Sequence, residues 1–241
     1  MNVREVIAKF LRSRGYALIR DPQKKFFEMH RFDVVLDVGA NTGQYGIEVR
    51  KECQYKNRIV SFEPMSAAYA QLAKNAARDE GWTTVPCGLG NIDEKQQINI
   101  AGNSASSSLY DMLPAHSDIA PVSAYVSSET VQIRKLDAIF DQYCQPGEKV
   151  LLKIDTQGYE VEVLKGATES LKHVSALQLE LSLSPLYAGA PLMEDVMFLV
   201  REQGFVPYWF LHGFKNPQTL QLMQMDGLFI RPGDRDSKKH S

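Results

Sequence analysis

The sequence predicts an α/β fold with a doubly wound, mostly parallel sheet that ends in an antiparallel hairpin. From residue 33 onward, short apolar runs alternate with segments of helical spacing, the pattern of a parallel sheet with crossover helices. The last two apolar runs have no helix-length segment between them, which indicates a hairpin. The chain has 241 residues, 44% hydrophobic and 23% charged, and these values suit one large domain.

The first 32 residues are expected to form a helical appendage to this domain. Apolar residues recur there at the spacing of an amphipathic helix, at Val3, Val6, Ile7, Phe10 and Leu11. Such a helix needs a larger surface to pack on, so we place it outside the main domain, which spans residues 33–233.

Within the main domain, each predicted element follows from its residue pattern. Continuous apolar runs predict buried parallel strands at residues 34–36, 59–62, 150–154 and 176–179. Spaced apolar positions predict crossover helices at residues 43–53, 66–80, 159–173 and 192–203. The terminal hairpin is expected at residues 205–211 and 227–230.

Two segments depart from this alternation. Residues 101–130 are rich in Ser, Ala and Pro and have only weak periodicity, so we expect an irregular, cap-like insertion. Residues 234–241 are polar and are expected to form a disordered tail.

Composition limits the partners and the compartment. The formal net charge is -2 and no basic block is present, so nucleic acid is not expected as a partner. We expect no membrane span and no signal peptide, because no apolar run has the necessary length. The three cysteines are widely spaced and indicate neither a disulfide framework nor a zinc site. We therefore expect a soluble, cytoplasmic protein; a homodimer is compatible with the sequence.

A turn after the first predicted strand indicates a cofactor site. Asp37 ends the strand, and Gly39 and Gly43 follow before a predicted helix. Glycines allow backbone N–H groups to approach a ligand closely. The Asp37 carboxylate would repel the phosphates of NAD and attract a cation such as the α-ammonium of S-adenosylmethionine. Glu63, at the end of the next strand, is placed to accept hydrogen bonds from ribose hydroxyls.

Each of these features also has a purely structural explanation. A turn with two glycines four residues apart is common as a tight strand-to-helix connection, and an acid at a strand end is often only solvated. The occurrence of Asp37 and Glu63 together, at successive strand ends, favours the nucleoside site.

Three blocks of the sequence resemble the FkbM family of methyltransferases: residues 36–45 (LDVGANTGQY), 62–64 (FEP) and 152–166 (LKIDTQGYEVEVLKG). Residues 103–109 (NSASSSL) are similar to a Ser-Ser-Leu stretch that lies near the cofactor in this family. The resemblance covers residues 33–231. It implies a Rossmann-like, class I methyltransferase fold with a seven-stranded sheet, and S-adenosylmethionine as cofactor. The implied reaction is O-methylation of a hydroxyl on a sugar or secondary metabolite, as in natural product biosynthesis.

The resemblance also implies which residues bind the cofactor. These are Asp37, Gly39, Asn41, Gly43, Gln44, Tyr45, Glu63, Pro64, Ser107 and Asp155. The motifs do not choose the nucleophile, so an N- or C-methyl acceptor stays open. An NAD-dependent oxidoreductase is disfavoured because the Gly-x-Gly-x-x-Gly turn is missing. A non-catalytic module is disfavoured because the acids at all three strand ends are intact.

Transfer to a neutral hydroxyl needs a general base or a metal ion. Asp155 is the leading candidate base, because it ends a predicted central strand at the edge where ligands bind in open α/β sheets. Glu180 ends the next strand and is expected to face the same cavity, and His116, in the insertion, has an ordinary pKa near neutrality. The structural alternatives are a helix cap for Asp155, an ion pair for Glu180 and a solvated ring for His116. A magnesium ion is compatible with the carboxylate pair, but no metal site is predicted.

Overall fold

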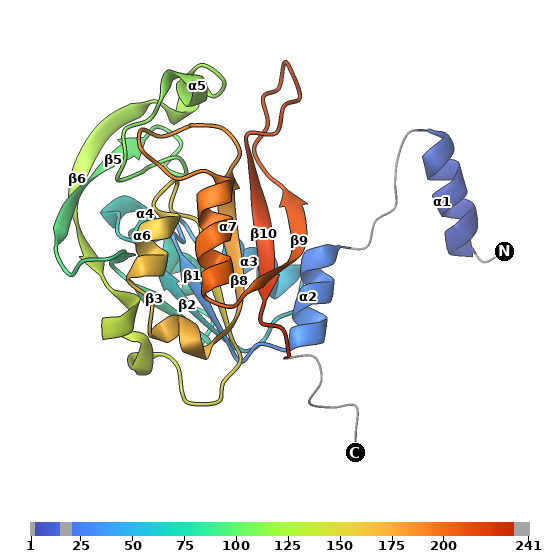
Figure 1. Cartoon of the computed structure of the whole chain (residues 1–241), viewed down its shortest axis with the longest axis horizontal. Helices are drawn as coiled ribbons and strands as arrows, with labels where there is room; N and C mark the ends of the chain where they lie inside the picture. The colour runs from blue at the N-terminus through green and yellow to red at the C-terminus, as the bar shows by residue number, and fades with distance from the viewer. Residues whose placement is uncertain (1–2, 15–20, 234–241) are drawn as a thin grey trace.

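The computed structural model describes residues 3–14 and 21–233, and its centre is a seven-stranded sheet (Figure 1). The strand order is β3 (Trp82–Val85), β2 (Arg58–Phe62), β1 (Val34–Val38), β7 (Val150–Ile154), β8 (Val174–Ser182), β10 (Gln224–Ile230) and β9 (Val206–His212). The five strands from β3 to β8 are parallel, and β10 is antiparallel to both of its neighbours. The predicted fold class is confirmed.

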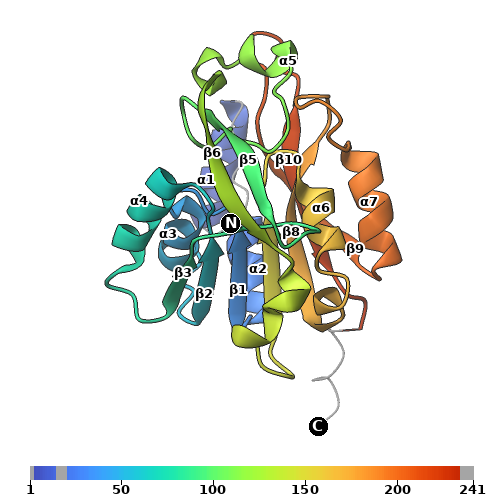
Figure 2. The same cartoon turned by 90° about the vertical axis from the view of Figure 1, so that its left-hand side faces the viewer.

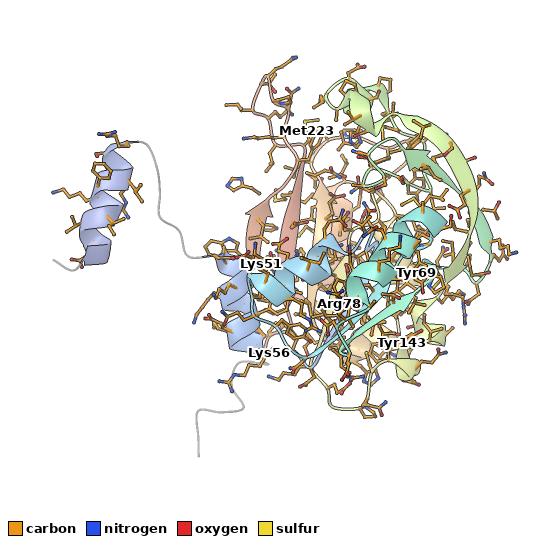
Figure 3. All side chains as sticks on the ribbon, turned by 180° about the vertical axis from the view of Figure 1, so that it is seen from behind. Lys51, Lys56, Tyr69, Arg78, Tyr143 and Met223 are labelled. Carbon is orange, nitrogen blue, oxygen red and sulfur yellow. The ribbon has the colours of Figure 1, made fainter. Side chains whose placement is uncertain are left out.

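Helices cover both faces of this sheet. One face carries α2 (Pro22–His30), α3 (Gln44–Lys51) and α4 (Ser66–Ala76), and the other carries α6 (Glu160–Lys165) and α7 (Met193–Glu202). Figure 2 shows α3 and α4 on one side of the sheet and α6 and α7 on the other. Figure 3 views the molecule from behind and shows the face that carries α2, α3 and α4, with Lys51 marking the end of α3. The third predicted helix is interrupted, because α6 ends at Lys165 and a short 3-10 turn, η4 (Ser170–His173), follows.

The N-terminal segment differs from its prediction. It contains α1 (Val3–Ser13), whose Val6, Ile7 and Phe10 side chains are exposed, and also α2. Phe26 of α2 is fully buried in the core beside the sheet, so this part of the predicted appendage belongs to the main domain. A helix of nine residues carries too few apolar positions to show a period in the sequence.

The predicted insertion is only partly irregular. β4 (Gly88–Leu89), β5 (Lys95–Ala101) and β6 (Tyr125–Arg134) form a second sheet in the order β4-β6-β5, which lies beside the main sheet in Figure 1. Residues 125–130, predicted as irregular, are therefore strand. Most side chains in this half of β6 are exposed, so the sequence has no apolar alternation there.

The rest of the insertion connects β5 to β6 and carries α5 (Pro114–Ser117) and the 3-10 turn η1 (Pro121–Ser123). After β6, the turns η2 (Leu136–Ala138) and η3 (Phe140–Gln142) lead to β7. The predicted tail, residues 234–241, lies outside the described residues. None of the helices in the described ranges has the length and apolar character that a membrane crossing requires.

Candidate active site

Two cavities adjoin the carboxyl ends of the parallel strands. Gly39 follows β1, Glu63 follows β2 and Asp155 follows β7, so the three predicted positions meet at one edge of the sheet. Gly39, Asn41, Ala105 and Asp155 line both cavities and form the boundary between them. The prediction that these strand ends share one site is supported by this arrangement.

The first cavity has a mainly apolar wall. Its apolar side chains come from strand ends of both sheets and from the insertion: Val38, Met65, Leu89, Ile98, Leu109 and Ile133. Glu63 and Pro64 also line it, as does Ser107, whose Oγ accepts the N–H of Ala101. The cavity is narrow, about 60 Å³. An apolar wall with one carboxylate suits an aromatic base joined to a sugar diol.

Glu63 is held rigidly at the edge of this first cavity. The side chain is 2% exposed, and its two oxygens accept backbone N–H groups of Asn41 at 2.7 Å and Met65 at 2.8 Å. Burial raises the pKa of Glu63 to about 7 despite these hydrogen bonds. Each carboxylate oxygen retains a lone pair, so the group can still accept a hydroxyl from a ligand.

The glycine turn after β1 differs from its prediction, in which its backbone N–H groups approach a ligand. The N–H groups of Gly39 and Ala40 both donate to the Phe62 carbonyl, and the N–H of Gly43 donates to Ala40. The first two amides tie the end of β1 to β2, the third bonds within the turn, and none of the three is free for a ligand. Gly39 has φ 75°, and a Cβ there would overlap the Asp155 carbonyl oxygen. Glycine is needed at this position because the ends of β1 and β7 approach so closely.

Asp37 also has a role that the sequence did not indicate. The residue is fully buried, is not among the described residues that line either cavity, and accepts a hydrogen bond from Ser61 Oγ. Its carboxylate lies 3.1 Å from Lys153 Nζ, in register on β7. Burial alone would lower the pKa of Lys153, but Asp37 and Asp155 raise it. Asp37 therefore neutralises a buried lysine, and its contact with a ligand cation stays a prediction.

Asp155 is oriented from two sides. Its Oδ1 accepts Gln157 Nε2 at 2.9 Å, and its Oδ2 lies 3.6 Å from Lys153 Nζ. The same Gln157 nitrogen donates to Glu180 Oε2 at 2.8 Å, and the Gln157 carbonyl oxygen Oε1 accepts Tyr187 Oη at 2.7 Å. Asp155 and Glu180 are therefore brought together, as predicted, although Glu180 lies within β8, which continues to Ser182, and not at its end.

Glu180 nevertheless differs from Asp155 in access to the cavities. It is not among the described residues that line them. Its pKa is raised well above the usual range by burial first, and then by the neighbouring carboxylates of Asp155, Glu160 and Asp226. Glu180 is thus set apart from Asp155, whose side chain is 36% exposed and lies at the boundary of the two cavities.

The second cavity is larger, about 280 Å³, and its wall is polar. Besides the shared residues, its lining comes from α2, α3 and three strands of the main sheet: Gln23, Gln44, Tyr45, Glu48, Lys153, Gln178 and Asp226. Tyr45 Oη donates to Gln178 Oε1 at 2.9 Å. Burial and the charge of Asp155 raise the pKa of Asp226 to about 7.

Besides Asp37 and Glu180, two further predicted residues lie outside both cavities. His116 is buried in α5 and packs against Tyr187 and Phe214, with ring centroids 5.3 and 5.4 Å apart. Burial lowers its pKa, and it is not among the described residues that line either cavity. Gly43, with φ 91°, precedes α3, and a Cβ there would lie 2.9 Å from Leu72 of α4. Gly43 therefore allows α3 and α4 to pack closely, and its contact with the cofactor stays a prediction.

Sequence reasoning missed Lys153, Gln157, Gln178 and Asp226. Lys153 carried a usable signal, because a lysine inside an otherwise apolar parallel strand is rarely buried unless it is paired. The other three are ordinary polar residues whose partners lie on different elements, so nothing local marks them. Within the described part of the chain, no three His, Cys, Asp or Glu side chains gather to hold a metal ion.

A parallel sheet with a glycine turn after β1 and an acid after β2 is typical of α/β proteins that bind a nucleoside cofactor. Comparison with known families is more specific, since the model of the methyltransferase FkbM domain matches residues 37–207. The chain belongs to the FkbM family of methyltransferases, and the resemblance seen in the sequence is confirmed.

Individual relatives are moderately similar. The hexuronic acid methyltransferase AglP of Haloferax volcanii is 28% identical over 191 residues, 74% of this chain and 71% of that protein. The methyltransferase sdnD of Sordaria araneosa is 26% identical over 176 residues, 61% of this chain and 68% of that protein. A crystal structure of the methyltransferase FkbM from Methylobacillus flagellatus KT matches with a TM-score of 0.48 and 15% identity, over 81% of this chain and 43% of that chain.

Proposed function

We propose that this methyltransferase uses S-adenosylmethionine to methylate a hydroxyl of a sugar or secondary metabolite. The observation that carries the proposal is the position of Asp155, which lines both cavities and is oriented by Gln157 and Lys153. A carboxylate between a nucleoside-like cavity and a polar cavity is where a general base for the acceptor hydroxyl is needed.

The first cavity supports the cofactor part of the proposal. Its apolar wall suits the adenine, and Glu63 suits the two ribose hydroxyls. Asn41 is 9% exposed, and its side-chain nitrogen has no hydrogen-bond partner among the described residues, so it is a free donor at the boundary of the cavities. Bound S-adenosylmethionine would supply the methyl group from its sulfonium.

The residues at the boundary support O-methylation. Deprotonation of a hydroxyl by Asp155 raises its nucleophilicity as the methyl group is transferred, and the proton stays on the Asp155 carboxyl. Gln157 fixes the direction of this carboxylate, and alignment is a large part of the catalysis of an in-line displacement. Similarity to a hexuronic acid methyltransferase supports a sugar as the acceptor class.

Ligand binding and turnover test this proposal. Thermal shifts with adenosylhomocysteine and with NAD separate a methyltransferase from an oxidoreductase, and we expect stabilisation by the former alone. A panel of hydroxylated sugars and metabolites, assayed for adenosylhomocysteine release with and without a chelator, then identifies the acceptor. Stabilisation by NAD alone would contradict the proposal.

A further inference from the structure

We infer that Tyr187 is a positioning residue for the proposed general base and acts through the side-chain amide of Gln157. Tyr187 lies in the segment between β8 and α7 and is not among the described residues that line either cavity. The inference rests on the proposed function, in which Asp155 takes the proton of the acceptor hydroxyl. Tyr187 acts on Asp155 only by way of Gln157.

The side-chain amide of Gln157 holds Asp155 in only one of its two orientations. Its nitrogen donates to Asp155 Oδ1 at 2.9 Å and to Glu180 Oε2 at 2.8 Å. In the reversed orientation the amide oxygen would face these two carboxyl groups, and Asp155 would lose the hydrogen bond from Gln157. Asp155 is therefore held only while the oxygen of Gln157 points away from it.

The hydroxyl of Tyr187 keeps the oxygen of Gln157 in that direction. Tyr187 Oη donates to Gln157 Oε1 at 2.7 Å and lies 3.3 Å from the carbonyl oxygen of Ser106. A hydroxyl has one proton and both neighbours are acceptors, so the shorter contact, to Gln157, is the stronger one. Burial, and then the nearby carboxyl of Glu180, raises the pKa of Tyr187, so the hydroxyl keeps its proton and remains a donor.

Tyr187 is itself fixed by the loop between β5 and β6, residues 102–124. Its side chain is 1% exposed and packs edge-on against the ring of His116, with centroids 5.3 Å apart. On either side of it, backbone hydrogen bonds of 2.9 and 2.8 Å join residues 186 and 188 to this loop. The loop thus holds Tyr187, and Tyr187 holds Gln157.

Loss of the hydroxyl would release the amide of Gln157. Gln157 lines the first cavity, so its side chain has space to turn once no donor holds its oxygen. Tyr187→Phe removes only Oη and leaves the ring in its packing against His116. We therefore expect the variant to keep the fold and ligand binding but to lose the alignment of Asp155, on which the rate of an in-line displacement depends.

The side-chain N–H signals of Gln157 test this link directly. They are identified in a ¹⁵N–¹H spectrum of the ligand-free protein by their absence in Gln157→Leu. We expect Tyr187→Phe to move both signals toward the positions of solvent-exposed glutamines, because the amide is no longer held. Unchanged signals in this variant would overturn the inference.

Tyr55→Phe is the matched control. Tyr55 is also buried, and its hydroxyl donates to a backbone carbonyl, that of Arg58, at 3.0 Å. Arg58 begins β2, whereas the cavities adjoin the other ends of the parallel strands. The control therefore removes a buried tyrosine hydroxyl far from Gln157 and should leave the Gln157 signals unchanged.

Turnover tests the consequence for the base. The acceptor probe is the most active member of a panel of methyl glycosides of glucose, galactose, mannose and their uronic acids. We expect Tyr187→Phe to lower kcat at least about tenfold and to change the KM of the acceptor by less than about threefold. Tyr55→Phe should have the kcat of the wild type. A wild-type kcat in Tyr187→Phe, or a fall no larger than in Tyr55→Phe, would overturn the inference.

A double variant tests whether Tyr187 acts through Gln157. Gln157→Leu should itself lower kcat, because Asp155 loses a donor. Tyr187→Phe combined with Gln157→Leu should then be no slower than Gln157→Leu alone, since the hydroxyl has no amide left to orient. Falls in kcat that multiply in the double variant would show that Tyr187 acts by another route, which contradicts the inference.

Adenosylhomocysteine binding, measured in the same preparations, separates this inference from the proposed function. Binding that depends on Glu63, combined with a wild-type kcat in Tyr187→Phe, removes only the role of Tyr187. Absence of adenosylhomocysteine binding by the wild type removes the proposed function, and the inference with it. A panel without a methylated member counts against the sugar acceptor, and the Gln157 signals then decide the inference alone.

Discussion

Gln157 is the residue that connects the two carboxylates of the site. One side-chain nitrogen donates to both Asp155 and Glu180, and the side-chain oxygen accepts Tyr187 Oη. Its backbone carbonyl also accepts Ser108 Oγ at 2.7 Å. These contacts fix the side chain of Gln157 in one orientation. In this orientation Asp155 lies at the boundary of the two cavities, whereas Glu180 is not among the described residues that line them.

Replacement of Asp155 by Asn tests the base. Asp155→Asn keeps the shape and an oxygen for Gln157, so the fold and adenosylhomocysteine binding should be retained. Turnover of an identified acceptor should fall about 10²-fold or more, as is usual when a general base is lost. Asp141→Asn, the same change on an exposed residue of η3, is the control and should be silent. Wild-type turnover in Asp155→Asn would leave Asp155 without a catalytic role.

For single residues, position relative to the predicted strands identified some residues of the site and missed others. Glu63 and Asp155 were found because each directly follows a buried strand. Asp37 was found for the same reason, but its carboxylate was predicted to bind a cation of the ligand. Its partner in the structure, Lys153, lies 116 residues away, and the register of the strands was unknown. A buried ion pair across two strands becomes visible only once their pairing is known.

Among the elements, the loop between β5 and β6 makes several contacts with the site. Ser104 Oγ donates to Asn41 Oδ1 at 3.1 Å, and Ser108 Oγ donates to Gln157. The same loop contributes Ala105, Ser107 and Leu109 to the wall of the first cavity. Because its residues form part of the cavity wall, we propose that this loop moves outward to admit the cofactor and then closes over it.

Hydrogen exchange tests this movement. We expect the amides of residues 102–124 to exchange more slowly when adenosylhomocysteine is added, and more slowly again with an acceptor, because the loop is then held by the ligand. The amides of α7, on the opposite side of the sheet from α3, serve as the internal reference. Equal protection of the loop with and without ligands would contradict a cap that closes over the site.

The central strands of the parallel sheet were the most directly predicted elements, because they are buried. Residues 34–38 and 150–154 are buried on both faces of a parallel sheet, so they form continuous apolar runs. Most side chains of β5 and of the first half of β6 are exposed or only partly buried, and many of them are polar, as in a loop. Their pairing is a long-range property and has no counterpart in local sequence.

For the molecule as a whole, the site concentrates acids that are costly to ionise. Burial raises the pKa of Glu63, Glu160 and Asp226 to about 7 and that of Glu180 well above its usual range. The unfolded chain ionises these groups at their ordinary values, near 4, so the folded protein holds more protons at neutral pH. The free energy of unfolding must therefore decrease as pH rises through this range.

Urea unfolding of the ligand-free protein at pH 6.5 and pH 8 measures this effect. We expect the free energy of unfolding to be lower at pH 8 by about 1–2 kcal/mol, since these carboxyls lose their protons in that interval. Burial lowers the pKa of His116, so this residue opposes the trend, but only slightly, because its unfolded-state pKa of 6.5 lies at the acidic end of the interval. Asp226→Asn should reduce the decrease. A free energy of unfolding that is constant or higher at pH 8 would show that the carboxyls are ionised in the folded protein.

The central claim, that Glu63 and its cavity bind the cofactor, is tested most directly by calorimetric titration with adenosylhomocysteine. We expect the wild-type protein to bind it and Glu63→Ala to bind it at least about tenfold more weakly, because a charged hydrogen-bond partner contributes about 1.5–3 kcal/mol. Glu52→Ala, at the exposed C-cap of α3, should bind like the wild type. No binding by the wild type, or equal affinities of the wild type and Glu63→Ala, would contradict the claim.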